Sequence, residues 1–153
     1  MSSAQGAFLD RISEDLKSAM KARDKPRLDT LRMVKTALKN EEIELGPLDD
    51  DRAVKVLVRL CKQRRDSIEQ FGAAGREDLA SIERRELAII EEYLPSEPDE
   101  AEIRGSIERA VAQTGASSAR QMGEVMKRVM AGFAGRPVDG KRVSQLVRER
   151  LSG

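Results

Sequence analysis

The residues from Gly135 to Lys141 have the spacing of a phosphate-binding loop. A P-loop places glycines ahead of a lysine, so that backbone N–H groups and the ammonium group surround phosphate oxygens. Arg142, however, occupies the position of the serine or threonine whose hydroxyl binds magnesium. The segment also follows a helical pattern, whereas a P-loop follows a strand. We therefore interpret residues 135–142 as a helix connection, and we expect no nucleotide and no other cofactor.

Most other catalytic chemistry is excluded by composition. The chain has no histidine and a single cysteine, Cys61, so it cannot form a histidine-based triad, a histidine-containing zinc site or an internal disulfide. Cys61 lies on an apolar helical stripe, where a cysteine usually packs as a small hydrophobe. The carboxylates between residues 41 and 51 lack the spacing of a calcium-binding EF-hand. We predict no catalytic residue and no metal site, and an enzyme ranks last among the functions considered.

Basic residues cluster in two stretches, although the whole chain has 28 basic against 27 acidic residues. Residues 52–65 contain six basic residues and no acidic one, and four of the six share one helical face: Arg52, Lys55, Arg59 and Lys62. Residues 120–150 contain eight basic against three acidic residues, whereas residues 96–119 contain two against five. A positive surface attracts phosphate backbones without selecting a sequence. Solvated helix faces are also charged, so charge alone leaves both RNA contact and a plain surface open.

The elements that carry these residues are predicted to be helices. Apolar residues recur every three or four positions and do not alternate as in a half-buried strand, so we predict an all-α fold. Asp49, Asp50 and Asp51 offer a cap and favourable charge at one helix start, and Ser118 with Gln121 has the spacing of a capping box at another. The apolar stripes predict a set of buried residues, namely Leu57, Cys61, Ile68, Ile82, Ile90, Val125, Val129 and Leu146.

Two prolines, Pro95 and Pro98, mark a predicted domain boundary because they prevent a continuous helix. We place a four-helix N-terminal domain at residues 1–95 and a three-helix tail domain at residues 96–153. The small tail can bury only a thin core.

The expected location is the cytoplasm. No window of 18 residues is free of charge, and the N-terminus lacks an apolar run after a charged start. We therefore expect neither a membrane span nor contact with a membrane, and no secretion. The single cysteine fits a reducing compartment.

Several motifs resemble the YqeY-like family of small bacterial proteins. They are KQRRDSIEQF at residues 62–71, AGREDLA at residues 74–80 and EEYLP at residues 91–95. MGEVMK at residues 122–127 and GRPVDGK at residues 135–141 are similar to the tail domain (GatB/YqeY) that this family shares with the B subunit of glutamine-dependent tRNA amidotransferases. The resemblance spans nearly the whole chain and implies a four-helix unit followed by a three-helix tail.

The resemblance implies contact with tRNA, because the amidotransferase tail helps to hold tRNA. The positions that match are Lys127, Arg136 and Lys141, and local charge adds Arg128, Arg142 and Arg148. The family association also implies a label of carbon–nitrogen ligase activity with glutamine as amide donor. The chain is too short for the catalytic domain of that enzyme, so the ligase label describes the enzyme whose tail it shares.

Two functions follow as predictions. The first is a non-catalytic accessory protein that binds tRNA, or a tRNA-modifying or tRNA-charging enzyme, without reading a DNA sequence. The alternative is a protein interaction module without RNA binding, which would use residues 52–65 or the methionine face of the sixth helix (Met122, Met126 and Met130). The oligomeric state stays open.

Overall fold

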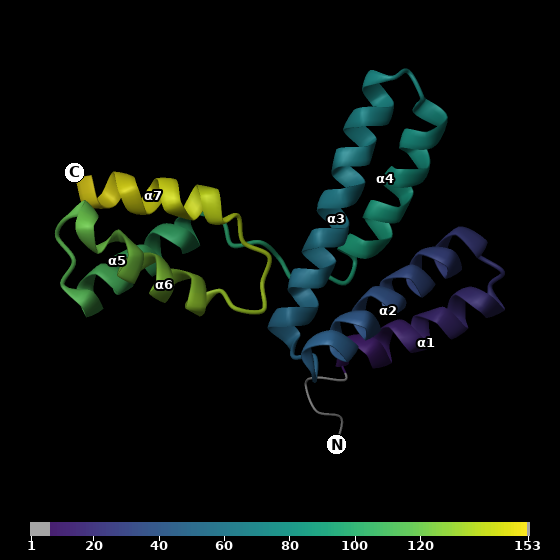
Figure 1. Cartoon of the computed structure of the whole chain (residues 1–153), viewed down its shortest axis with the longest axis horizontal. Coiled ribbons are helices and arrows are strands. Elements are labelled where there is room, and N and C mark those ends of the chain that lie inside the picture. The colour runs from purple at the N-terminus through teal and green to yellow at the C-terminus, as the bar shows by residue number, and fades with distance from the viewer. Residues whose placement is uncertain (1–6, 153) are drawn as a thin grey trace. The chain divides into compact units, whose positions relative to one another are not determined.

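A computed structural model describes residues 7–152, and in that range it contains seven α-helices, one short 3-10 helix and no strand (Figure 1). The all-α prediction is confirmed. The chain divides into two compact units, one ending at Leu94 and the other beginning at Pro95. That the chain consists of two domains, at residues 1–95 and 96–153, stays a prediction.

Unit 1 consists of two helical hairpins. The first contains α1 (Ala7–Lys21) and α2 (Lys25–Leu45), and the second contains α3 (Asp50–Ala73) and α4 (Glu77–Glu91) (Figure 1). Asp24 and Asp49 cap α2 and α3, where their carboxylates accept the backbone N–H groups of Arg27 at 3.2 Å and Arg52 at 2.8 Å. All four helices contribute to one apolar core, which includes Ile12, Leu31, Val34, Leu38, Leu57, Cys61, Ile90 and the adjoining Tyr93.

The prediction of burial fails at two positions in the second hairpin. Ile68 is only half-buried, and Ile82 is 49% exposed. The core of unit 1 includes α3 residues only as far as Cys61 and α4 residues only from Leu87 onward. Beyond these points the α3–α4 hairpin diverges from the α1–α2 hairpin (Figure 1), so its apolar stripe continues without cover from another helix of unit 1. The other six predicted positions are buried.

Unit 2 contains α5 (Glu100–Thr114), the 3-10 helix η2 (Ala119–Gln121), α6 (Met122–Gly132) and α7 (Gly140–Ser152). Asp99 and Glu102 form a capping box at the start of α5, and Ser118 with Gln121 forms the predicted one ahead of α6. The three α-helices enclose a core whose most buried members are Ile107, Val125, Val129, Val143, Leu146 and Val147.

Candidate functional site

Three of the six predicted RNA-binding residues form ion pairs within unit 2. The pairs are Arg136 with Glu102, Arg142 with Glu100, and Arg128 with Glu124. The other three predicted residues, Lys127, Lys141 and Arg148, form no ion pair with another residue in the described range. The structure therefore does not gather the six side chains into one uncommitted basic surface.

Pairing across the three-helix fold explains why the positive stretch near the C-terminus was misleading. Unit 2 contains ten basic and eight acidic residues in total. Carboxylates of α5, at Glu100, Glu102 and Glu108, hold arginines that follow α6 in the sequence. A count over residues 120–150 omits these carboxylates, which folding brings beside the basic helices.

Arg136 anchors the segment that resembles a P-loop. Its guanidinium donates to both carboxylate oxygens of Glu102 at 3.3 Å and to the Ser96 carbonyl at 3.0 Å. The hydrogen bond from Arg136 holds the pKa of the Glu102 carboxyl below its usual value. Asp139 accepts the Lys141 backbone N–H at 3.0 Å at the start of α7. The segment thus connects α6 with α7, as interpreted from the sequence.

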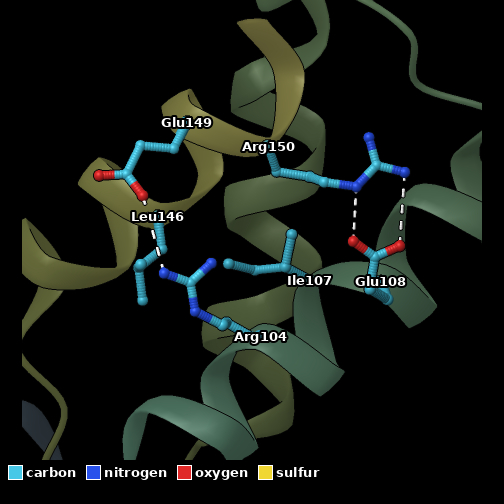
Figure 2. Close-up of a pocket in the computed structure, with 6 residues that line it drawn as sticks. All are labelled: Arg104, Ile107, Glu108, Leu146, Glu149 and Arg150. Atoms are coloured by element: carbon cyan, nitrogen blue, oxygen red, sulfur yellow. Dashed lines mark hydrogen bonds and ion pairs between the residues drawn. The ribbon is translucent and has the colours of Figure 1, made fainter. Parts of the chain in front are cut away.

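A pocket lies between α5 and α7 of unit 2 (Figure 2). Its volume is about 370 Å³, and its apolar residues are Ile107 from α5 and Leu146 from α7. Both side chains belong to the core of unit 2, with exposed fractions of 2% and 1%. The apolar part of the pocket is consequently rigid, because it is the outer layer of a packed core.

Four charged side chains border this pocket, and they form two ion pairs that join the helices (Figure 2). Arg104 of α5 approaches Glu149 of α7 at 3.8 Å, and Arg150 of α7 donates to both oxygens of Glu108 on α5. These side chains are between 43% and 59% exposed. Ion pairs with this degree of exposure contribute only about 0.2–1 kcal/mol each to stability, so they can rearrange when a partner approaches.

The balance of charge determines what the pocket can accept. Two guanidinium groups and two carboxylates border it, so a phosphate backbone would meet equal numbers of attractive and repulsive groups. An apolar side chain with polar neighbours of both signs fits this arrangement better. Sequence reasoning missed the site because Arg104 and Glu108 are separated by about 40 positions from Glu149 and Arg150, and only the fold brings them together.

The basic face of α3 is largely occupied by internal contacts. Arg52 donates to backbone carbonyls at the end of α2, the shortest contact being 2.7 Å to Pro47. Lys55 pairs with Asp51 at 3.1 Å, and Arg59 approaches Glu41 at 3.9 Å.

On α6, Met122 and Met126 pack against the core of unit 2, while Met130 is 36% exposed. Neither surface offered by the alternative function is a continuous free face.

Replacing Arg52 with alanine should destabilise unit 1 by about 1–3 kcal/mol, because carbonyls at the end of α2 lose their charged donor. Urea denaturation followed by circular dichroism measures this effect. Lys55→Ala is the matched control on the same helix, since its exposed ion pair contributes little. Equal midpoints for the two variants would show that the Arg52 hydrogen bonds contribute no more than a surface pair.

Tyr93, in the EEYLP motif, joins the end of α4 to the first hairpin. Its hydroxyl donates to Asp15, and the Arg11 guanidinium lies 4.4 Å from the ring centroid. Arg27 pairs with Glu92 at 2.7 Å beside it. Burial and the hydrogen bond to Asp15 raise the pKa of Tyr93 above its usual value. These contacts assign the motif a structural role in holding the two hairpins together.

The side chains of Arg64 and Cys61 have structural roles within unit 1. The Arg64 guanidinium, only 16% exposed, lies 3.1 Å from Glu86 and 3.8 Å from Glu83, and so joins α3 to α4. Cys61 is 1% exposed, and burial raises the pKa of its thiol, which keeps it protonated and unreactive.

Within residues 7–152 we find no cluster of histidine, cysteine or carboxylate side chains that could hold a metal ion, and no helix long and apolar enough to cross a membrane.

Comparison with known proteins identifies relatives. The sequence model of a family described as Yqey-like protein matches residues 9–151. Three relatives are each named "Altered inheritance of mitochondria protein 41, mitochondrial". The protein from Pyrenophora tritici-repentis is 33% identical over 97% of this chain and 83% of its own length. The proteins from Clavispora lusitaniae and Meyerozyma guilliermondii are 34% and 32% identical, over 82% and 99% of this chain and 76% and 80% of their own lengths.

These relatives correct two predictions. Their names refer to mitochondria and mention neither tRNA nor an amidotransferase. The predicted role of a non-catalytic, amidotransferase-related accessory that binds tRNA or a tRNA–enzyme complex is therefore wrong, and so is the predicted cytoplasmic location. The ion pairs of Arg136, Arg142 and Arg128 give the physical reason for the first error, because the charge that suggested RNA is largely balanced inside unit 2.

Proposed function

The chain belongs to the YqeY-like protein family, and we propose that it is a non-catalytic docking protein whose α5–α7 pocket binds an amphipathic helix of a partner protein. The observation that carries this proposal is the open pocket over Ile107 and Leu146, bordered by two ion pairs of opposite orientation. No side chain of its lining is a nucleophile, and each carboxylate is held by a guanidinium group.

The size and chemistry of the pocket define the partner. A volume of about 370 Å³ has room for one or two large apolar side chains. Burying each such side chain contributes about 1.5–3 kcal/mol. Helical anchors spaced three or four residues apart would enter the pocket from one face of the partner helix. Flanking charges of both signs would then exchange ion pairs with Arg104, Glu108, Glu149 and Arg150, which selects orientation more than affinity.

Capture of partners from the source cells tests the proposal. Tagged full-length protein is compared with Arg104→Glu plus Arg150→Glu, which makes the border of the pocket entirely acidic. The matched control is Lys127→Glu plus Arg148→Glu, which makes the same change of charge at exposed positions that do not line the pocket. Nuclease treatment before capture removes RNA from all samples.

We expect the wild-type chain and the control variant to capture the same defined set of proteins. The pocket variant should capture at least about tenfold less of them, because each disrupted charged contact within an interface costs about 1.4 kcal/mol or more. Quantitative mass spectrometry measures this loss. Equal capture by all three chains would refute the pocket as the docking site. Capture that disappears on nuclease treatment would refute direct protein docking.

A further inference from the structure

The far end of the α3–α4 hairpin has an apolar face that no helix of unit 1 covers. We call residues 64–86 the distal arm. Its large apolar side chains are Ile68 and Phe71 on α3, and Leu79 and Ile82 on α4. The first three are half-buried, and Ile82 is 49% exposed, although it is a large aliphatic residue in the middle of a helix.

Helical spacing shows that this face continues the one that forms the core of unit 1. Ile82 and Ile89 are seven residues apart, so they lie on one side of α4, and Tyr93 follows the end of that helix. Ile89 and Tyr93 belong to the core of unit 1, with exposed fractions of 8% and 2%, whereas Ile82 lies outside that core. The distal arm therefore presents the type of surface that elsewhere in unit 1 packs against two helices.

Charged residues beside Ile82 indicate which partner would cover this apolar face. Asp78 precedes Ile82 by four residues and Arg85 follows it by three, so the two charges lie on the same side of the apolar stripe, about two helical turns apart. Asp78 is bound by Arg76 at 3.1 Å, and Arg85 forms no ion pair with another residue in the described range. An antiparallel copy of α4, related by a two-fold axis at Ile82, would place its Asp78 opposite Arg85, and the reverse contact would form by symmetry.

We propose that two copies of this chain associate through their distal arms, with α4 packed antiparallel against α4 and Ile82 at the centre. The contact is independent of the docking pocket in unit 2. On α4 its apolar residues are Leu79 and Ile82, which are three positions apart, a length of roughly 5 Å along the helix. A contact of that length buries much less than the roughly 800 Å² per partner of a standard interface, so we expect a weak dimer with a dissociation constant on the order of 0.1 mM.

Sedimentation equilibrium of the full chain over a range of concentrations tests the dimer. We expect the mean mass of the wild-type chain to rise from monomer toward dimer. Ile82→Asp should weaken association at least tenfold, and the milder Ile82→Gln should weaken it less. Ala88→Asp is the matched control, because it introduces the same group at an exposed position of α4 that lies about a third of a turn around the helix from Ile82.

A charge exchange tests the antiparallel arrangement. Asp78→Arg and Arg85→Asp should each weaken self-association, because each homodimer then brings like charges together. Mixing the two variants should restore association to at least the wild-type level, since the heterodimer contains both opposite-charge contacts. Circular dichroism confirms that each variant is folded. A wild-type chain that stays monomeric, an Ile82→Asp variant that associates normally, or a mixture no tighter than its components would each overturn the proposal.

Discussion

Replacing Val125 with aspartate is expected to unfold unit 2 at room temperature or to lower its stability by several kcal/mol. Val125 is fully buried between α-helices, among Val129, Val143 and Val147, which are also fully buried. An aspartate there must either keep its charge without water or take up a proton, and both outcomes are costly. A unit of this size has little stability in reserve. Limited proteolysis should then cut the chain within residues 95–153 while unit 1 stays intact.

Thermal melts at two pH values separate this effect from a simple change in surface charge. Burial raises the pKa of a carboxyl group in the folded state, so the penalty is largest above the ordinary value of about 4 and decreases as pH falls. Ala131→Asp is the control, because Ala131 is an exposed residue of the same helix. Identical melts for the two variants at neutral pH would mean that the stripe containing Val125 does not face a core.

Replacing Tyr93 with alanine is expected to destabilise unit 1 by about 3–5 kcal/mol, because a large buried ring leaves a cavity between α4 and α1. Tyr93→Phe keeps the ring and removes only the hydroxyl that donates to Asp15. This second variant should cost about 1–3 kcal/mol, since the Asp15 carboxylate loses a partner. Urea denaturation of both variants separates packing from hydrogen bonding, and equal losses would show that the ring contributes nothing beyond its hydroxyl.

Tyr93 is the only tyrosine of the chain, so its ionisation can be followed directly by phenolate absorbance. Its pKa in the folded state is raised, and the stability that it contributes is therefore fully present below the ordinary value of about 10 and lost as pH rises further. We expect the native chain to contain little phenolate at pH about 10. The same chain unfolded by urea should show the ordinary titration of a tyrosine. A native titration identical to the unfolded one would contradict the buried Tyr93–Asp15 contact.

Local patterns were sufficient to predict the helices and several of their ends. Asp49, the capping box of Ser118 and Gln121, and the buried Val125 and Val129 depend on residues within a few positions of each other. The exposed Ile82 could not be recognised in this way. Its spacing is that of a core residue, and it lies outside the core because the α3–α4 hairpin diverges from the first hairpin (Figure 1).

The errors concerning charge have the same origin. Arg52 belongs to a basic run in the sequence, yet its partners are carbonyls at the end of a different helix. Arg136 and Arg142 belong to a positive window, yet their carboxylates are on α5, about 34 and 42 positions away. The pocket of Figure 2 depends on contacts of similar separation, so its signal in the sequence was limited to charges beside Ile107 and Leu146.

Site-specific crosslinking in the source cells tests the docking function most directly. A photoreactive amino acid is placed at Arg104, on the border of the pocket, and in a second chain at Arg148, an exposed residue of α7 that does not line it. If the pocket binds a partner helix, irradiation should link the position 104 chain to a defined protein, with crosslinked peptides from one amphipathic segment, and the position 148 chain should give at least about tenfold less of that product. Equal products from both positions, or crosslinks only to RNA, would contradict a docking site between α5 and α7.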